Sequence, residues 1–278
     1  CNADEGEPGT FKDRVILRND PHLLLESIII GGYAIGTSQG FIYIRGEYYH
    51  EIEAIEKAIK QAEEKGYLGK NILGSNFSFN IQLYKGAGAY VCGEETGLLE
   101  SMEGNRGCPD CRPPFPAQSG FMGKPTAVNN VETLVNIPAI ITNGGDWYSK
   151  IGSPDSPGPK LYCLSGQVNK PGVYELPMGI TLRELVEDYG GGARGELKAV
   201  LPGGVSSSLL TDLDVKLDYK SVAKAGSMLG SAAVIVINKD TSIIDVAKNT
   251  VEFFAHESCG KCSVCREGTR RAREMLTR

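Results

Sequence analysis

Three cysteines near the end of the chain have the spacing with the clearest chemical meaning. Cys259, Cys262 and Cys265 lie in "SCGKCSVCREG", with two residues between each cysteine and the next. Three thiolates placed this way can bind three corners of one iron–sulfur cube, with the intervening backbone N–H groups directed at the sulfurs. The spacing predicts a four-iron cluster. Because no cysteine follows Cys265 before Arg278, the fourth ligand is expected beyond Arg278 or from elsewhere.

Zinc is the alternative metal for this loop. His256 precedes Cys259 by three residues, which would allow a site of three cysteines and one histidine. Structural zinc sites more often use two separated pairs of ligands. The cysteine spacing therefore favours the iron–sulfur interpretation.

A glycine loop is the second candidate for chemistry. In "GAGAYVCGEETGLLESMEG", residues 86–104, Gly86, Gly88 and Gly93 follow a strand pattern and lead into a helix pattern. The spacing is not that of the dinucleotide motif G-x-G-x-x-G. The adjacent Glu94 and Glu95 would repel a phosphate, but they suit hydroxyl and ring N–H donors. A ribose diol or the edge of a flavin ring offers those groups.

Three further stretches carry groups of the same kind. "CNADEGEPG" is rich in acidic and amide side chains, "VNNVET" contains two amides, and "RPPFPA" offers an aromatic ring on a stiff loop. Each stretch also has an ordinary structural explanation. Acidic runs are usually exposed to solvent, pairs of asparagines often cap helices, and proline-rich segments are often loops without a function. Beside an electron-transfer cluster they predict a polar cavity for a flavin and a nicotinamide cofactor. The candidate cofactor-binding residues are Asn2, Asp4, Glu5, Glu7, Gly86, Gly88, Tyr90, Gly93, Glu94, Glu95, Phe115, Asn129 and Asn130.

The elements expected around these residues alternate between helix and strand. A helix capped by Asp20 is predicted over 19–36, and an amphipathic helix is predicted over 51–66, with Ile52, Ile55, Ala58, Ile59 and Ala62 on its apolar side and Gly66 at its end. Strands are expected over 40–46 and 77–85, and a further helix over 94–103. This order is the α/β pattern.

A second domain is expected after the proline- and glycine-rich stretch 152–160. Strands over 160–168 and 172–177 form a hairpin, a helix with a Thr181–Glu184 capping box follows, and "SAAVIVI" is a later strand. This order predicts a ubiquitin-like β-grasp domain. A helix, the cysteine loop and a second helix complete the chain. The predicted domains are 1–152, 160–238 and 240–278.

Composition limits the partners. The chain has 278 residues and a net charge of −5, which argues against nucleic acid as the main partner. Its apolar runs are far shorter than the roughly 20 residues of a membrane helix. The spacing of the eight cysteines suits metal chemistry in a reducing compartment, so a cytoplasmic location is expected. A start at Cys1 without methionine, and an end inside a helix pattern, are expected for a fragment.

Five motifs together resemble one family. "CNADEGEPGT", "GAGAYVCGEET", "RPPFPA", "GKPTAVNNVET" and "ESCGKCSVCREG" occur in this order. They resemble the flavin-bearing, NADH-oxidising subunit of respiratory complex I and the corresponding subunit of NAD(P)-linked iron hydrogenases and formate dehydrogenases. The resemblance implies a Rossmann-like flavin domain, a β-grasp domain and a helical iron–sulfur domain.

The resemblance also implies an activity: hydride transfer from NADH to FMN, then electron transfer to a [4Fe-4S] cluster and on to iron–sulfur partner subunits. The complex would stand in the cytoplasm or on the cytoplasmic face of a membrane, and quinone, ferredoxin, protons or carbon dioxide would be its final acceptor. Glu7 and Glu95, the catalytic candidates, match acidic positions that line the nicotinamide cofactor pocket, and Phe115 matches an aromatic that packs on adenine. The positions that match flavin and cluster contacts are Asn2, Asp4, Gly93, Glu94, Asn129, Asn130, Cys259, Cys262 and Cys265.

The chain departs from this family pattern in three ways. The glycine-rich segment expected to bind the FMN phosphate upstream of Cys1 is missing, and so is the fourth cluster cysteine. Cys108 and Cys111 form an unexpected pair, which could be a redox couple, additional metal ligands or two inert thiols; we favour inert thiols. The alternative function, from another class, is a non-catalytic zinc- or ligand-binding module built on the β-grasp domain.

Overall fold

The computed structural model describes residues 1–277, which fold as two compact units. The first unit contains residues 1–6, 13–142 and 259–261, and the second contains 7–12, 143–258 and the chain from 262 onward. The longest segments of the two units meet at Thr142 and Asn143, upstream of the proline- and glycine-rich stretch. Each unit has its own hydrophobic core.

A parallel sheet organises the first unit. Its strands are β1 (Asn2–Ala3), β2 (Gln39–Arg45) and β3 (Asn80–Gly86), in the order β1-β2-β3. β2 and β3 pair along their whole length, from Gln39 opposite Asn80 to Arg45 opposite Gly86. The parallel order confirms the α/β prediction. The strand begins at Asn80 instead of Phe77 because the backbone of Phe79 bonds to Gly69 and not to β2.

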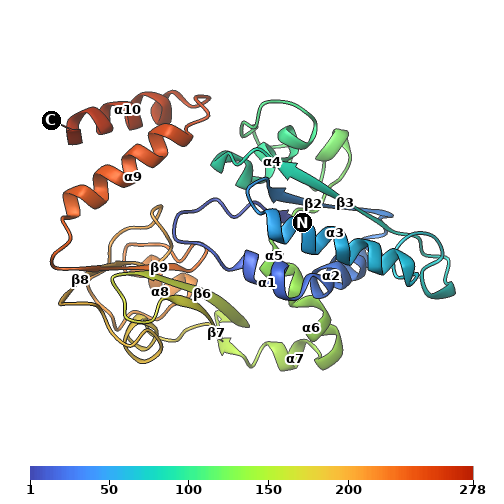
Figure 1. Cartoon of the computed structure of the whole chain (residues 1–278), viewed down its shortest axis with the longest axis horizontal. Helices are drawn as coiled ribbons and strands as arrows, with labels where there is room; N and C mark the ends of the chain where they lie inside the picture. Colours follow the sequence, from blue (N-terminus) through green and yellow to red (C-terminus); the bar gives the residue numbers. More distant parts are fainter. Residues whose placement is uncertain (278) are drawn as a thin grey trace. The chain divides into compact units, whose positions relative to one another are not determined.

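Helices pack beside this sheet, as Figure 1 shows for α2 (Pro21–Ile35) and α3 (Tyr49–Glu64). The Asp20 side chain accepts a hydrogen bond from the Leu23 N–H at 3.1 Å and caps α2, as predicted. Of the predicted apolar stripe of α3, Ile52, Ile55, Ala58 and Ala62 are buried. The unit's other helical segments are α1 (Asp13–Asn19), η1 (Ile72–Gly74), η2 (Tyr90–Gly93), α4 (Glu95–Met102), η3 (Phe121–Gly123), α5 (Val131–Val135) and α6 (Ile137–Asn143).

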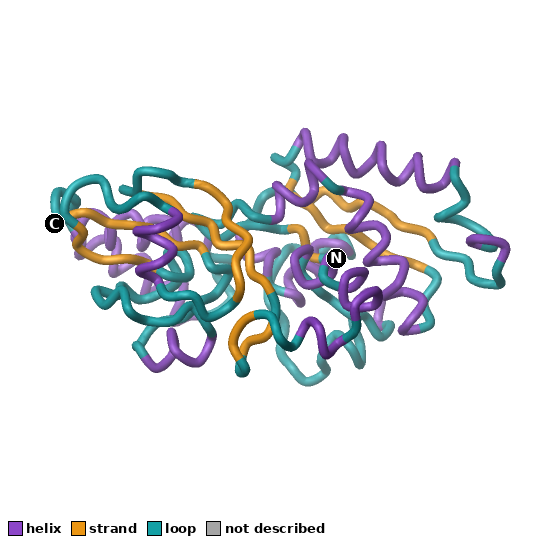
Figure 2. Tube along the Cα trace, turned by 90° about the horizontal axis from the view of Figure 1, so that it is seen from below, coloured by secondary structure: helices purple, strands orange, loops and turns teal. Residues whose placement is uncertain are grey.

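A mixed four-stranded sheet organises the second unit, in the order β7-β6-β9-β8. β6 and β7 form the predicted antiparallel hairpin, and β6 is parallel to β9, which is the arrangement of a β-grasp domain. Figure 2 shows these strands as neighbouring orange traces. The strands are β6 (Pro159–Gly166), β7 (Gly172–Pro177), β8 (Leu197–Leu201) and β9 (Ala233–Asn238), beside the short helices α7 (Gly145–Tyr148) and α8 (Tyr219–Lys224) and the hairpin β4 (Gly152–Ser153) and β5 (Ser156–Pro157).

The capping box of the β-grasp helix is present. The Thr181 N–H donates to the Glu184 carboxylate at 2.6 Å, and the Glu184 N–H donates to the Thr181 hydroxyl at 3.1 Å. The helix that follows, η4 (Glu184–Tyr189), is a π-helix, a type that the sequence analysis did not specify. The Gly190 N–H bonds to the Leu185 carbonyl five residues earlier, so the wider turn extends to the glycine stop.

Two helices hold the cysteine loop, as predicted. They are α9 (Ile243–Glu257) and α10 (Ser263–Thr277), drawn in orange and dark red in Figure 1. Cys265 lies inside α10, so only two of the three spaced cysteines are in the loop itself. Among the helices of residues 1–277, none has the length and apolar composition that a membrane crossing requires.

A buried hydroxyl tests the β-grasp core. Tyr162 is fully buried, and its hydroxyl donates to the Leu217 carbonyl at 3.1 Å. Tyr162→Phe should lower the free energy of unfolding by about 0.5–1.5 kcal/mol, because the buried Leu217 carbonyl loses one of its two donors and keeps the Gly179 N–H. Tyr174→Phe is the matched control, since the Tyr174 hydroxyl bonds to the Lys170 carbonyl at an exposed position. Urea denaturation, followed by hydrogen exchange of the β6 and β9 amides, measures both. Equal effects would contradict this assignment.

Candidate functional site

Predicted cofactor residues gather where the parallel strands of the first unit end. β1 ends at Ala3 and continues into Asp4, and β3 ends at Gly86 and continues into the glycine loop. In open α/β sheets, ligands bind in the crevice outside the carboxyl ends of the strands. The residues at this edge therefore occupy the place where such a fold holds a ligand.

Asn2 links three distant segments at this edge. Its side-chain Nδ2 donates to the Gly93 carbonyl at 2.9 Å, and its Oδ1 accepts from the Asp4 N–H at 3.0 Å. Its backbone N–H donates to the Asn129 carbonyl at 2.7 Å. Four predicted flavin contacts are thus held together by one residue.

Asn130 joins the same group. Its Nδ2 donates to the Asn2 carbonyl at 3.2 Å and to the Asp13 carboxylate at 2.7 Å. Its Oδ1 accepts from the Glu132 N–H at 3.0 Å and caps α5. The side-chain amides gathered here can both donate and accept, and the backbone carbonyls accept, as a flavin ring edge requires.

The first two glycines of the loop are packed against their own chain. A Cβ at Gly86 would lie 2.7 Å from the Tyr43 hydroxyl, and a Cβ at Gly88 would lie 2.3 Å from the Glu47 carboxylate. Gly88 also has a φ of 84°, which favours glycine. The buried Tyr43 ring thus limits the space at Gly86, the positive φ explains Gly88, and the expected contact of both with a cofactor stays a prediction. Tyr90 of the same loop lies against Gly6.

Glu94 caps helix α4. Its carboxylate accepts from the backbone N–H groups of Thr96 and Gly97 at 3.0 and 2.9 Å, and from the Thr96 hydroxyl. A carboxylate at a helix N-terminus satisfies free N–H donors and complements the helix dipole. One of the two paired glutamates therefore serves the helix that follows the loop.

Glu95 forms an ion pair that the sequence analysis missed. Arg112 lies 2.6 Å from the Glu95 carboxylate and 3.6 Å from the Glu94 carboxylate. The Arg112 guanidinium also lies 6.0 Å from the centre of the Phe115 ring, which is itself exposed. The only signal was its place directly before "PPFPA". The structure thus brings together Glu94, Glu95, Phe115 and one cation.

Glu5 is the most buried of the acidic candidates. Its carboxylate accepts from the Asp13 N–H at 2.8 Å and from the Tyr48 hydroxyl at 2.9 Å, with Arg14 at 3.5 Å. Burial, together with the neighbouring Glu5 charge, raises the pKa of the Tyr48 hydroxyl. The carboxylate of Asp4 lies 4.0 Å from Arg45. These contacts hold the chain as it leaves β1.

Glu7 belongs to the second unit. Its carboxylate accepts from the Ser206 N–H at 2.8 Å and from the Ser206 hydroxyl at 2.7 Å. Gly204 leaves room for this contact, because a Cβ there would lie 2.5 Å from Glu7 Oε1. No sequence pattern marked Ser206 as a partner of Glu7.

The cysteines of the predicted cluster differ in exposure. Cys259 is half-buried, whereas Cys262 and Cys265 are exposed. Within residues 1–277, no three metal-binding side chains are gathered as ligands, and His256 is 86% exposed beside Glu257. The donor set itself, three thiols within seven residues, fits a four-iron cluster. Cys108, from the unexpected pair, is near Cys259; partial burial and the neighbouring Cys259 raise the pKa of the Cys108 thiol.

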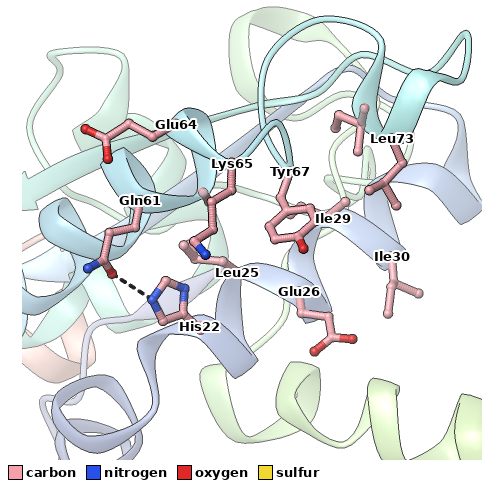
Figure 3. Close-up of a pocket in the computed structure, with 12 residues that line it drawn as sticks. His22, Leu25, Glu26, Ile29, Ile30, Gln61, Glu64, Lys65, Tyr67 and Leu73 are labelled. Carbon is pink, nitrogen blue, oxygen red and sulfur yellow. Dashed lines mark hydrogen bonds between the residues drawn. The ribbon is translucent and has the colours of Figure 1, made fainter.

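A separate apolar pocket lies between α2 and α3 (Figure 3). It has a volume of about 800 Å³, and at its rim His22 hydrogen-bonds to Gln61 at 2.9 Å. Its lining consists of residues from α2, the end of α3 and the segment around Tyr67 and Leu73. None of the predicted cofactor residues is among them.

Three family models match the chain in the expected order. A Nuo51 FMN-binding domain matches residues 1–139, an SLBB domain matches 160–236, and the iron–sulfur binding region of NADH-ubiquinone oxidoreductase-F matches 245–278. The resemblance drawn from the five motifs is confirmed, as is the order of the domains. The cofactors that these descriptions name, FMN and a 4Fe-4S cluster, are those predicted.

Individual relatives agree with these matches. An NADH-quinone oxidoreductase subunit of Rhizobium meliloti (strain 1021) is 56% identical over 96% of this chain and 65% of its own length. The NADP-reducing hydrogenase subunit HndC of Solidesulfovibrio fructosivorans is 52% identical over 100% of this chain and 57% of its own. A crystal structure of an NAD⁺-reducing [NiFe]-hydrogenase in the H₂-reduced state matches with a TM-score of 0.90 at 40% identity, over 99% of this chain and 46% of the other. The chain thus spans less than two thirds of these proteins.

The cap of α4 gives a test of the Glu94 assignment. Glu94→Ala should destabilise α4 by about 0.5–2 kcal/mol, because two helix N–H groups lose their acceptor. Glu100→Ala removes a carboxylate from the same helix without removing a cap, and it should change stability by less than about 0.5 kcal/mol. Hydrogen exchange of the α4 amides measures both variants. Similar protection in the two variants would show that Glu94 is not the cap.

Proposed function

Because the chain belongs to the Nuo51 FMN-binding family, we propose that it is part of an NADH-oxidising flavoprotein subunit. Electrons from NADH would pass through FMN to a four-iron cluster and on to iron–sulfur partner subunits. The observation that carries the proposal is the gathering of Asn2, Asp4, Gly93, Asn129 and Asn130 at the carboxyl edge of a parallel sheet. When bound, FMN accepts the two electrons of a hydride and releases them singly to the cluster.

The amide cluster is proposed to orient the flavin. Asn2 and Asn130 are themselves fixed by hydrogen bonds to Gly93 and Asp13, so they would meet a ring edge without reordering. Such preorganisation lowers the entropic cost of binding. Glu5, Gly86, Gly88, Tyr90 and Glu94 are proposed to complete the surroundings of the cofactor, Glu94 by shaping the start of α4.

The nicotinamide cofactor is proposed to meet Glu95, Glu7 and Phe115. Carboxylates accept hydrogen bonds from ribose hydroxyls and repel a 2′-phosphate, as at the acidic position of Rossmann sites, so NADH is the proposed substrate. Phe115 would pack on the adenine. Arg112 is the observation that favours the alternative, NADPH, because a cation beside Glu95 reduces the repulsion of a phosphate.

Cys259, Cys262 and Cys265 are proposed to hold three corners of the cluster. The backbone N–H groups of the loop would donate to the cluster sulfurs. A partner with its own iron–sulfur centres would take the electrons, and the cytoplasm, where NADH is produced, is the proposed compartment. The terminal acceptor would depend on that partner. The zinc-bound, non-catalytic module has no comparable support among the family matches.

Steady-state kinetics test the proposal. The full-length protein, purified with FMN and cluster, should reduce an artificial dye such as ferricyanide with NADH as donor. Flavin-free protein is the control and should be inactive until FMN is added. A fully loaded protein that is inert with both NADH and NADPH would refute the proposed function.

Glu95→Gln tests the proposed pocket. Loss of a charged hydrogen bond to a ribose hydroxyl should lower kcat/KM for NADH by about 10–100-fold, and NADPH should lose much less. Glu100→Gln, on the same helix but outside the proposed pocket, is the matched control and should keep the parent kinetics. Unchanged NADH kinetics in Glu95→Gln would remove this residue from the pocket.

A further inference from the structure

The segment that carries Cys108 lies beside the segment that carries Cys259, although 151 positions separate the two cysteines in the sequence. Their thiols are near enough to interact electrostatically. Both residues are half-buried, whereas Cys111, the other member of the unexpected pair, is exposed. Cys108 is therefore the member of the pair that meets a proposed cluster ligand.

Two cations hold the segments that carry these thiols together. The Arg106 guanidinium donates to the Cys259 carbonyl at 2.7 Å. From the other side, Lys261 donates to the Pro109 carbonyl and lies 3.3 Å from the Asp110 carboxylate. Arg106, two positions before Cys108, thus contacts the Cys259 segment, and Lys261, two positions after Cys259, contacts the Cys108 segment.

The loop that carries Cys108 is itself anchored. The Asp110 N–H donates to the Thr96 hydroxyl at 2.8 Å. Gly107 packs so closely that a Cβ there would lie 2.5 Å from the Cys92 sulfur. Contacts on both sides of Cys108 therefore fix its position, so the proximity of the two thiols belongs to a built arrangement.

We propose that Cys108 and Cys259 form a thiol–disulfide site that protects the cluster ligand when no cluster is bound. The co-reactant is a small-molecule disulfide of the glutathione type. The role of Cys259 as a cluster ligand rests on the proposed function; the formation of the disulfide does not. Cys108 thereby acquires a function that the fold family and the cysteine spacing do not assign.

The chemistry balances in two exchange steps. One thiolate, from Cys108 or Cys259, attacks the small disulfide, forms a mixed disulfide and releases one small thiolate. The neighbouring thiolate then attacks the protein sulfur of that mixed disulfide and displaces the second small thiolate. Two cysteine thiols lose two protons and two electrons, and the small disulfide gains the two electrons. The fixed proximity of the two thiols favours the second step, because it is intramolecular.

The cluster and the disulfide exclude one another. A Cys259 sulfur bound to iron is not available for exchange, and a Cys259 sulfur in a disulfide cannot bind iron. Formation of the disulfide would therefore be reversible, because a reducing thiol regenerates the free Cys259 thiol. It would also protect Cys259 from irreversible oxidation to sulfinic or sulfonic acid. Reduction is then required before cluster insertion.

The test uses the full-length protein, with its cluster or stripped of iron by a chelator, incubated with oxidised glutathione. Free thiols are then alkylated, and tryptic peptides are analysed by mass spectrometry. The stripped protein should yield a Cys108–Cys259 cross-linked peptide, and the loaded protein should not. Dithiothreitol should remove the cross-link and restore uptake of iron and sulfide. FMN content checks that each sample remains folded.

Two variants separate the cysteines of the pair. Cys108→Ser should abolish the cross-link, and Cys111→Ser, the matched control, should retain it. The proposal fails if Cys259 cross-links to Cys111, if Cys108 keeps a stable glutathione adduct, or if the loaded protein cross-links equally. If the cross-link forms but Cys259→Ser leaves the iron content of the cluster unchanged, the proposed function of Cys259 fails while the disulfide stands.

Discussion

The hydrogen bond from the Asn2 side chain to the Gly93 carbonyl, 2.9 Å long, is the contact on which the candidate site depends. Asn2 lies in a strand that pairs with β2, so its position is fixed by the sheet. Through its side chain and backbone it sets the end of the glycine loop and the position of Asn129. The sheet thereby determines where the loop ends, and the loop determines where α4 begins. A site assembled from three distant segments needs such a fixed point.

The acidic residues near Asn2 have two different roles. Glu5 is buried in contacts with Asp13 and Tyr48, and Glu94 caps α4. These carboxylates stabilise the backbone that surrounds the site. Glu95 is held by Arg112 near an exposed aromatic ring, where a ligand can reach it. The glycine loop ends in paired glutamates that have different roles. Glu94 caps the N-terminus of α4, and Glu95, the first residue of α4, pairs with Arg112.

Sequence patterns were sufficient for local elements. The cap of α2 at Asp20, the stripe of α3 and the capping box at Thr181 each follow from short-range rules, and the structure contains them. Contacts between residues that are distant in the sequence could not be predicted from such rules. The contact of Glu95 with Arg112 and the proximity of Cys108 to Cys259 involve residues that only the folded chain brings together. The π-helix at Glu184 was missed because helix-forming residues do not by themselves set the width of the turn.

The central claim is that this fold holds a flavin that NADH reduces. Anaerobic stopped-flow mixing of the full-length, FMN-loaded protein with NADH tests it most directly, with the visible absorbance of the flavin as the signal. We expect this absorbance to bleach in a single turnover, at a rate that saturates with NADH concentration. A flavin that stays oxidised in the presence of NADH, yet is reduced at once by dithionite, would contradict the claim.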